Sequence, residues 1–95
     1  MKIIQATFYI KADKREKFLT DIQPLIQSTR LEEGCIEYHL YESIEEKNQF
    51  VMIENWESQE AIDNHNQNPL LKQLFNNLKE YSEKPTILTI SNKED

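Results

Sequence analysis

Two hydrophobic periodicities alternate along this chain of 95 residues, and their order restricts the folds that it can adopt. Period-two alternation, which is typical of strands, occurs in residues 2–10, 35–43, 49–56 and 86–90. Helical spacing occurs in residues 13–31 and 58–81. The order β-α-β-β-α-β predicts one ferredoxin-like α+β domain over residues 1–95, with an antiparallel sheet and helices on one of its faces.

The first helical region carries signals for a start, an interruption and an end. Asp13, with Glu16 three residues later, resembles a capping box and predicts the helix start. Pro24 is expected to kink the helix or to break it in two, because proline lacks the N–H that an interior position needs. Gly34 is expected to end the helical region.

The second helical region divides at Pro69. Ser58 is the expected cap of a short helix, and Asn68 followed by Pro69 suits the cap and first position of the next helix. The stripe that follows is apolar at helical spacing and consists of Leu70, Leu71, Leu74, Phe75, Leu78 and Tyr81. Residues 91–95 are expected to form a polar tail after the last strand.

Charge and composition exclude several classes of protein. Seventeen acidic against eleven basic residues give a net charge of −6, which disfavours nucleic acid or an anionic membrane as the partner. No segment has the roughly 18 uninterrupted apolar residues of a membrane helix. The N-terminal segment reads as a first strand and not as a signal peptide.

Cysteine, glycine and histidine are scarce, and their scarcity narrows the chemistry. Cys35 is the single cysteine, so we expect no internal disulfide and a reducing, cytoplasmic location. Gly34 is the single glycine, which excludes the Gly-rich loops that bind phosphates. The two histidines have no acidic residue at ligand spacing, so no metal site is predicted.

Several strands carry apolar side chains on both faces, although helices are expected to cover only one. The pairs of opposite parity are Ile3 with Ile4, Phe50 with Val51, Met52 with Ile53, and Ile87 with Leu88. A sheet that faces water alternates more cleanly, so we expect a homodimer in which a second subunit covers the open face. The alternative is that a small domain exposes some aliphatic residues.

Three segments carry a resemblance to a known family. They are EEGCIEYHLYES at Glu32–Ser43, FVMIENWES at Phe50–Ser58, and AIDNHNQNPLLK from Ala61 to Lys72. A Glu-x-Trp strand end, a histidine nine residues later and a proline four residues beyond are reasonably specific together. The chain resembles the antibiotic biosynthesis monooxygenase (ABM) superfamily over nearly its whole length, and within it the quinol monooxygenases most closely.

The resemblance implies a dimeric ferredoxin-like protein. Members of the superfamily oxidise aromatic polyketides or quinols without a cofactor, isomerise small phosphorylated ketones, or degrade haem, and fold alone does not choose among these activities. The haem-degrading members carry an asparagine, a tryptophan and an iron-ligating histidine where this chain has Thr7, His65 and Phe75. All three positions differ, so haem degradation is disfavoured.

His65 is the candidate catalytic residue. It lies one turn after Ala61 and three residues after Ile62, so it shares their inward face. An imidazole titrates near neutral pH and can act as a general base on a substrate oxygen. The alternative is a structural histidine that binds a backbone carbonyl at a helix end. The family resemblance favours the functional interpretation.

The candidates for substrate binding lie on two strands and the last helix. Trp56 offers an apolar wall, although core packing is its favoured role. Glu54 either reaches the pocket or pairs with a basic side chain at a sheet edge. Asn55 has the opposite parity, so it faces the same cavity only if the strand bulges. Tyr38 has a hydroxyl that could orient a ligand, and Phe75 belongs first to the core stripe and second to the pocket.

The leading hypothesis is a cofactor-independent monooxygenase that oxidises a quinol-like or phenolic small molecule with dioxygen. The second is an isomerase of a small hydroxyketone, of the autoinducer-2 phosphate type. A phosphorylated substrate would need a cationic anchor, for which Arg30 and Lys72 are the nearest candidates, and both look solvated. The third is a non-catalytic dimer that binds a hydrophobic metabolite.

Overall fold

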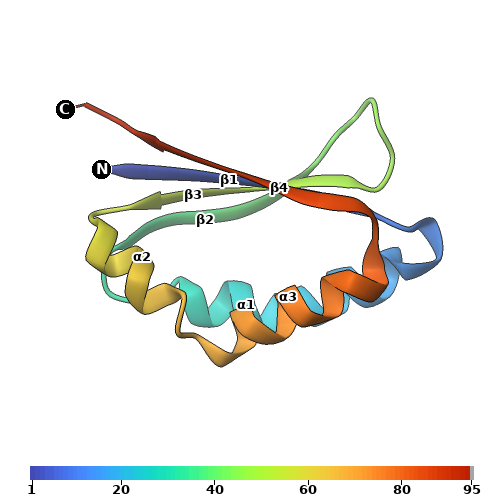
Figure 1. The fold of residues 1–95 in the computed structure, drawn as a ribbon, viewed down its shortest axis with the longest axis horizontal. Helices are drawn as coiled ribbons and strands as arrows, with labels where there is room; N and C mark the ends of the chain where they lie inside the picture. The colour runs from blue at the N-terminus through green and yellow to red at the C-terminus, as the bar shows by residue number, and fades with distance from the viewer. Residues whose placement is uncertain (95) are drawn as a thin grey trace.

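Four antiparallel strands form one sheet, and the helices cover one of its faces (Figure 1). The computed structural model describes residues 1–94. Its strands are β1 (Lys2–Ile10), β2 (Cys35–Glu42), β3 (Gln49–Trp56) and β4 (Ser82–Asn92). Its helices are the 3-10 helix η1 (Ala12–Lys14), α1 (Arg15–Thr29), α2 (Gln59–His65) and α3 (Pro69–Tyr81). The strand order β2-β3-β1-β4 confirms the predicted ferredoxin-like α+β fold.

The first helix differs from its prediction at both ends and in its middle. Asp13 lies in the 3-10 turn, and the N-cap of α1 is Lys14, whose side chain makes no capping bond. Pro24 does not divide α1, since its exposed position leaves the buried residues Ile22 and Leu25 to hold the helix on the sheet. The helix ends at Thr29, so Gly34 belongs to the turn before β2.

The second helical region follows its prediction. The Ser58 hydroxyl accepts a hydrogen bond from the N–H of Ala61 at 3.2 Å and caps α2. The side-chain oxygen Oδ1 of Asn68 accepts one from the N–H of Leu70 at 2.9 Å, with Pro69 in the first turn of α3. Both caps satisfy N–H groups that a helix start leaves without partners.

The last strand is longer than its prediction, because it starts at Ser82, before Pro85. Pro85 lies where the β1–β4 register shifts, between the Thr7 and Tyr9 pairings, and β4 is an edge strand. Proline is tolerated at such places because no ladder hydrogen bond is lost. Ser91 and Asn92 of the expected polar tail therefore belong to the strand, and Asp95 lies outside the described residues.

Aromatic packing closes the core between α1 and the sheet. The ring of Phe18 lies 5.6 Å from that of Phe8 on β1 and 5.2 Å from that of Phe50 on β3, measured between centroids. Phe18 is fully buried. Truncating a buried phenylalanine to alanine typically costs about 3–5 kcal/mol, so this contact is a main anchor of α1.

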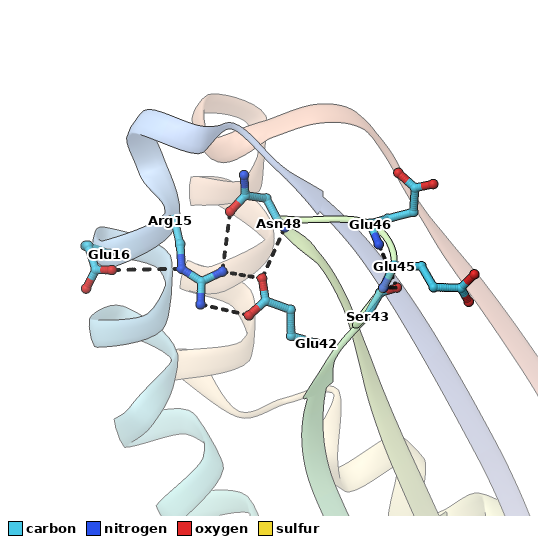
Figure 2. Close-up of polar contacts among 7 residues, drawn as sticks. All are labelled: Arg15, Glu16, Glu42, Ser43, Glu45, Glu46 and Asn48. Atoms are coloured by element: carbon cyan, nitrogen blue, oxygen red, sulfur yellow. Dashed lines mark hydrogen bonds and ion pairs between the residues drawn. The ribbon is translucent and has the colours of Figure 1, made fainter.

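A polar brace joins the start of α1 to the β2–β3 hairpin (Figure 2). The Arg15 guanidinium binds both carboxylate oxygens of Glu42, with Nη2 at 2.7 Å from Oε1. The backbone N–H of Asn48, which has a φ of 65°, donates to Glu42 Oε2 at 3.1 Å. The hairpin turn is closed by the Ser43 hydroxyl, which accepts bonds from the N–H groups of Glu45 and Glu46.

The other face of the sheet has no helix on it among the described residues (Figure 1). The strand registers place Ile3, Val51, Ile53 and Ile87 on this open face. Ile87 is 54% exposed, and the other three are half-buried. None of the helices in residues 1–94 has both the length and the apolar character to cross a membrane.

Candidate functional site

A small cavity of about 70 Å³ lies between the sheet and helices α2 and α3. Most of its walls are apolar, since the pleat of β1 turns Ile4, Ala6 and Phe8 towards the helices. The polar residues on its walls are Tyr38, Glu54, His65 and Asn66. An apolar cavity with a few convergent polar groups is the common form of a small-molecule site.

His65 occupies the last turn of α2 and is only 3% exposed. Its Nδ1 lies 3.1 Å and 3.2 Å from the two carboxylate oxygens of Glu32, in the turn after α1. The Glu32 carboxylate also accepts a hydrogen bond from the Asn68 amide at 2.8 Å. The same amide donates to the Ser28 hydroxyl at 2.9 Å. A chain of polar contacts therefore runs from α1 and α3 to the imidazole.

Two aromatic rings fix the plane of the imidazole. The Trp56 ring lies 4.7 Å from the His65 ring between centroids, at an interplanar angle of 35°. The Tyr38 ring meets it edge-on, at 5.5 Å and 70°. The rotation of His65 is thus limited by packing on two sides as well as by the bond to Glu32.

Glu54 is a buried carboxylate on the cavity wall, 5% exposed. Burial raises its pKa to about 7, and the charge of Glu32 adds to the effect, while a hydrogen bond from Trp56 opposes it. Burial, together with the charge of Glu54, also raises the pKa of Tyr38, so its phenol keeps its proton. The cavity therefore offers a proton-exchanging carboxyl group and a neutral hydroxyl donor beside His65.

The model of the family described as antibiotic biosynthesis monooxygenase (ABM) matches residues 1–77. This chain belongs to the ABM family. The Bacillus subtilis (strain 168) protein named "Putative monooxygenase YcnE" is 43% identical over 67 residues, which cover 70% of each chain. The protein sll1783 of Synechocystis sp. is 32% identical over 88 residues, which cover 93% of this chain and 60% of that protein.

Two solved structures share the fold of this chain. A conserved protein from Methanosarcina mazei Go1 superposes with a TM-score of 0.92 and 30% identity, covering 98% of this chain and 92% of that one. Rv0793 from Mycobacterium tuberculosis superposes with a TM-score of 0.91 and 28% identity, covering 99% of this chain and 95% of that one. These structures show the fold, whereas the family assignment rests on the match over residues 1–77.

The cavity between the sheet and helices α2 and α3 brings together four of the six site residues that were predicted from the sequence. Tyr38, Glu54 and His65 lie on its walls, and Phe75 lies at its rim, where the side chain is 44% exposed. Trp56 is fully buried behind the wall and does not line the cavity; it contacts His65 and donates from Nε1 to Glu54 at 3.0 Å.

Asn55, predicted as a substrate-binding residue, does not line the cavity. Neighbouring residues of a strand point to opposite faces, and the register irregularity lies in β2, between Cys35 and Glu37, while β3 stays regular. The Asn55 amide points to the open face and donates to the Glu37 carboxylate at 2.8 Å. The bulge that would have turned Asn55 towards the cavity is absent from β3.

Three residues that support the site were not predicted as site residues from the sequence. Glu32 and Ser28 flank the end of α1, and Asn68 was expected only as a helix cap. Asn68 does both tasks, because its oxygen caps α3 while its nitrogen binds Glu32. Cys35 lies nearby, and burial, with the charges of Glu32 and Glu54, raises the pKa of its thiol to about 11. The thiol is therefore a weak nucleophile at neutral pH.

Proposed function

We propose that this protein is a cofactor-independent monooxygenase that oxidises a neutral quinol-like or phenolic molecule with dioxygen. The observation that carries the proposal is the buried imidazole of His65 on the wall of an apolar cavity, backed by the Glu32 carboxylate. A base in a water-poor, low-dielectric site is suited to remove a phenolic proton. Membership of the ABM family supports the same reaction class.

The reaction requires a general base and a site from which water is excluded. His65 takes the phenolic proton, and the electron-rich phenolate passes one electron to dioxygen. The two radicals combine, forming a C–O bond at a ring carbon that bears hydrogen. The peroxide takes up the proton from His65, its O–O bond breaks as the ring hydrogen leaves, and a quinone and water are formed. Tyr38 and the protonated form of Glu54 supply hydrogen-bond donors for the substrate oxygens.

The charge of the cavity favours a neutral substrate. Among the described residues, those that line it include no lysine or arginine. Arg30 instead binds the Tyr38 carbonyl at 3.0 Å and His39 at 3.1 Å, and Lys72 binds Gln67. The Glu32 carboxylate lies 3.1 Å from His65, and Glu54 on the cavity wall is negatively charged whenever it is ionised. These charges weigh against the isomerisation of a phosphorylated hydroxyketone, which would need a cationic anchor.

The size of the cavity implies that the substrate enlarges it on entry. An apolar cavity of about 150 Å³ holds benzene, which is larger than the volume of about 70 Å³ observed. Phe75 lies at the rim with Leu88 and Ile90 of β4, and all three side chains are about half exposed. A rotation of Phe75 away from β4 is the simplest way to admit an aromatic ring.

We further propose that the protein acts as a homodimer in the cytoplasm. The uncovered sheet face carries the partly exposed side chains of Ile3, Val51, Ile53 and Ile87, which a second copy would bury. The lone thiol of Cys35 suits a reducing compartment.

Oxygen uptake tests the proposed reaction. Purified protein is incubated aerobically with a panel of hydroquinones and naphthols, without added cofactor, and compared with the autoxidation blank. We expect uptake above the blank for wild type, loss of it in His65→Ala, and retention in His39→Ala, since His39 is exposed on the other face of the sheet. Circular dichroism verifies that both variants are folded.

An absence of uptake with every substrate would refute the oxygenase proposal. The same samples then decide between the remaining hypotheses. Exchange of the carbon-bound hydrogens of a small hydroxyketone, followed by NMR in D₂O, would indicate an isomerase. Thermal stabilisation by aromatic ligands without any turnover would indicate a non-catalytic binding module.

A further inference from the structure

The contact between Glu32 and His65 joins two segments that are 33 residues apart in the sequence. Both carboxylate oxygens lie within hydrogen-bond distance of Nδ1, at 3.1 Å and 3.2 Å. The His65 side chain is 3% exposed and that of Glu32 is 22% exposed. The carboxylate thus lies behind the imidazole, where water has limited access, and not on the cavity wall itself.

The charge of Glu32 decides which nitrogen of His65 carries the proton. An ionised carboxylate only accepts hydrogen bonds, so a neutral His65 donates to it from Nδ1–H. The other nitrogen, Nε2, then holds a lone pair. Among the residues that the structure describes, none makes a hydrogen bond to Nε2 of His65. Nε2 is also not among the fully buried polar atoms that lack a partner in residues 1–94, so it is accessible to a water-sized molecule, and the cavity is the space that His65 borders.

We propose that Glu32 is a positioning residue, which fixes the tautomer and the orientation of His65 so that Nε2 receives the substrate proton. This inference rests on the proposed function for its chemical purpose. After proton transfer both ring nitrogens carry hydrogen, and the adjacent carboxylate stabilises the imidazolium that has formed. Glu32 does not touch the substrate and acts only through His65.

Glu32 is itself held in place by two contacts. The Asn68 side chain has a fixed orientation, because its oxygen accepts the N–H of Leu70 and its nitrogen must then face Glu32 and Ser28. The Glu32 turn is closed by the N–H of Cys35, which donates to the Glu32 carbonyl at 3.2 Å. The carboxylate is thus positioned before any substrate binds, which is the arrangement that an orienting group needs.

No other group around His65 is placed to orient the imidazole through a hydrogen bond to Nδ1, among the residues that the structure describes. Glu54, from β3, bonds to the Trp56 indole instead of to the imidazole. Tyr38, from β2, and Trp56 meet the ring through their aromatic faces and edges. The described residues give His65 no other hydrogen-bond partner for Nδ1.

Replacement of the carboxylate by an amide tests the inference. In Glu32→Gln, Asn68 still donates to the position of Oε1, so the amide NH₂ takes the position of Oε2, 3.1 Å from Nδ1. An NH₂ group donates to Nδ1, whereas the amide oxygen at the position of Oε1, 3.2 Å from Nδ1, still accepts from it, so the ring hydrogen is divided between Nδ1 and Nε2. Glu33→Gln, one residue away and exposed, is the matched control.

Nitrogen-15 NMR of the His65 ring, at alkaline pH where an imidazole is neutral, reports the tautomer without any substrate. We expect an acceptor-type signal at Nε2 in wild type and in Glu33→Gln, and a shift towards the Nε2–H form in Glu32→Gln. In the oxygen-uptake assay we expect kcat to fall roughly 10- to 100-fold in Glu32→Gln with little change in KM, because general-base catalysis is worth about 10²–10⁴-fold.

The two readouts separate the failure of this inference from that of the proposed function. An Nε2–H tautomer in wild type, or a tautomer that Glu32→Gln leaves unchanged, would overturn the positioning role. The expected tautomer change without oxidation of any hydroquinone would uphold the positioning role and refute the oxygenase. Partial recovery of the wild-type tautomer in Glu32→Asp, which restores a carboxylate, would support the inference further.

Discussion

The indole Nε1 of Trp56 donates a hydrogen bond to Oε1 of Glu54 at 3.0 Å, from a position two residues further along the same face of β3. This bond satisfies one oxygen of a carboxylate that is 5% exposed. The other oxygen has no hydrogen-bond partner among the described residues. One bond compensates only part of the cost of burying a charge, which is why the pKa of Glu54 rises to about 7.

Glu54→Gln should stabilise the protein at alkaline pH and have a smaller effect at acid pH. The pKa of Glu54 is about 7 in the folded state, against its ordinary value of 4.5. Its ionisation therefore destabilises the fold, and this destabilisation develops as the pH rises from about 4.5 to about 7. We expect the free energy of unfolding at pH 8 to rise by about 3 kcal/mol or less in the variant.

Urea denaturation at pH 5 and at pH 8 measures this difference. Glu57→Gln, on an exposed carboxylate just after β3, serves as the control and should change stability little at either pH. An equal effect of Glu54→Gln at both pH values would show that Glu54 ionises in the same range whether the protein is folded or unfolded.

Gly34→Ala should destabilise the protein and loosen the site. Gly34 has a φ of +86°, and an added Cβ would lie 2.5 Å from the Cβ of Ala61 in α2. The left-handed backbone costs a non-glycine residue about 1–2 kcal/mol, and overpacking adds about 1–3 kcal/mol. Because this turn carries Glu32 and α2 carries His65, the variant should also weaken the contact between them.

Chemical denaturation and the His65 NMR signals measure both effects of Gly34→Ala. Glu33→Ala, at the preceding exposed position, should change the free energy of unfolding by less than about 0.5 kcal/mol. If Gly34→Ala were as stable as wild type, the turn could move away from α2 to make room for the added Cβ without loss of free energy of unfolding.

Ile53→Glu should convert the proposed homodimer to a monomer. Ile53 lies on a central strand, paired with Gln5 on one side and His39 on the other, and faces the uncovered side of the sheet. A charge buried in an apolar interface without a partner is strongly unfavourable. Sedimentation equilibrium at micromolar concentration should therefore show a dimer for wild type and a monomer for Ile53→Glu.

Asn76→Glu is the control, because it adds the same charge on the exposed side of α3, away from the sheet. This variant should sediment with the same mass as the wild-type dimer. Wild-type protein that sediments as a monomer throughout this concentration range would contradict the homodimer.

Local sequence patterns were sufficient to predict the fold. Period-two and helical spacing report which side of an element is buried, and this information lies within a few neighbouring residues. Ser58 and Asn68 could be predicted as caps for the same reason, since a capping side chain binds an N–H two or three residues away. The shared inward parity of Glu54 with Met52 on β3 likewise followed from alternation alone.

Local patterns failed where a distant contact competes with them. Asp13 is a residue type that often caps a helix, yet α1 starts at Arg15, whose guanidinium binds Glu42 on β2 (Figure 2). Pro24 does not break α1, because packing on the sheet holds the turns on both sides. The last strand starts at Ser82 and not after Pro85, because β1 offers it a partner strand from that point.

By itself, the sequence determined the order of elements, the inward faces and the candidate base, His65. Only the tertiary structure decided that Glu32 stands behind that base, that Asn55 points away from it, and that the cavity closes to about 70 Å³. Periodicity is a property of neighbouring residues, whereas the bond between Glu32 and His65 spans 33 positions. It depends on how one turn packs against one helix, which no local pattern records.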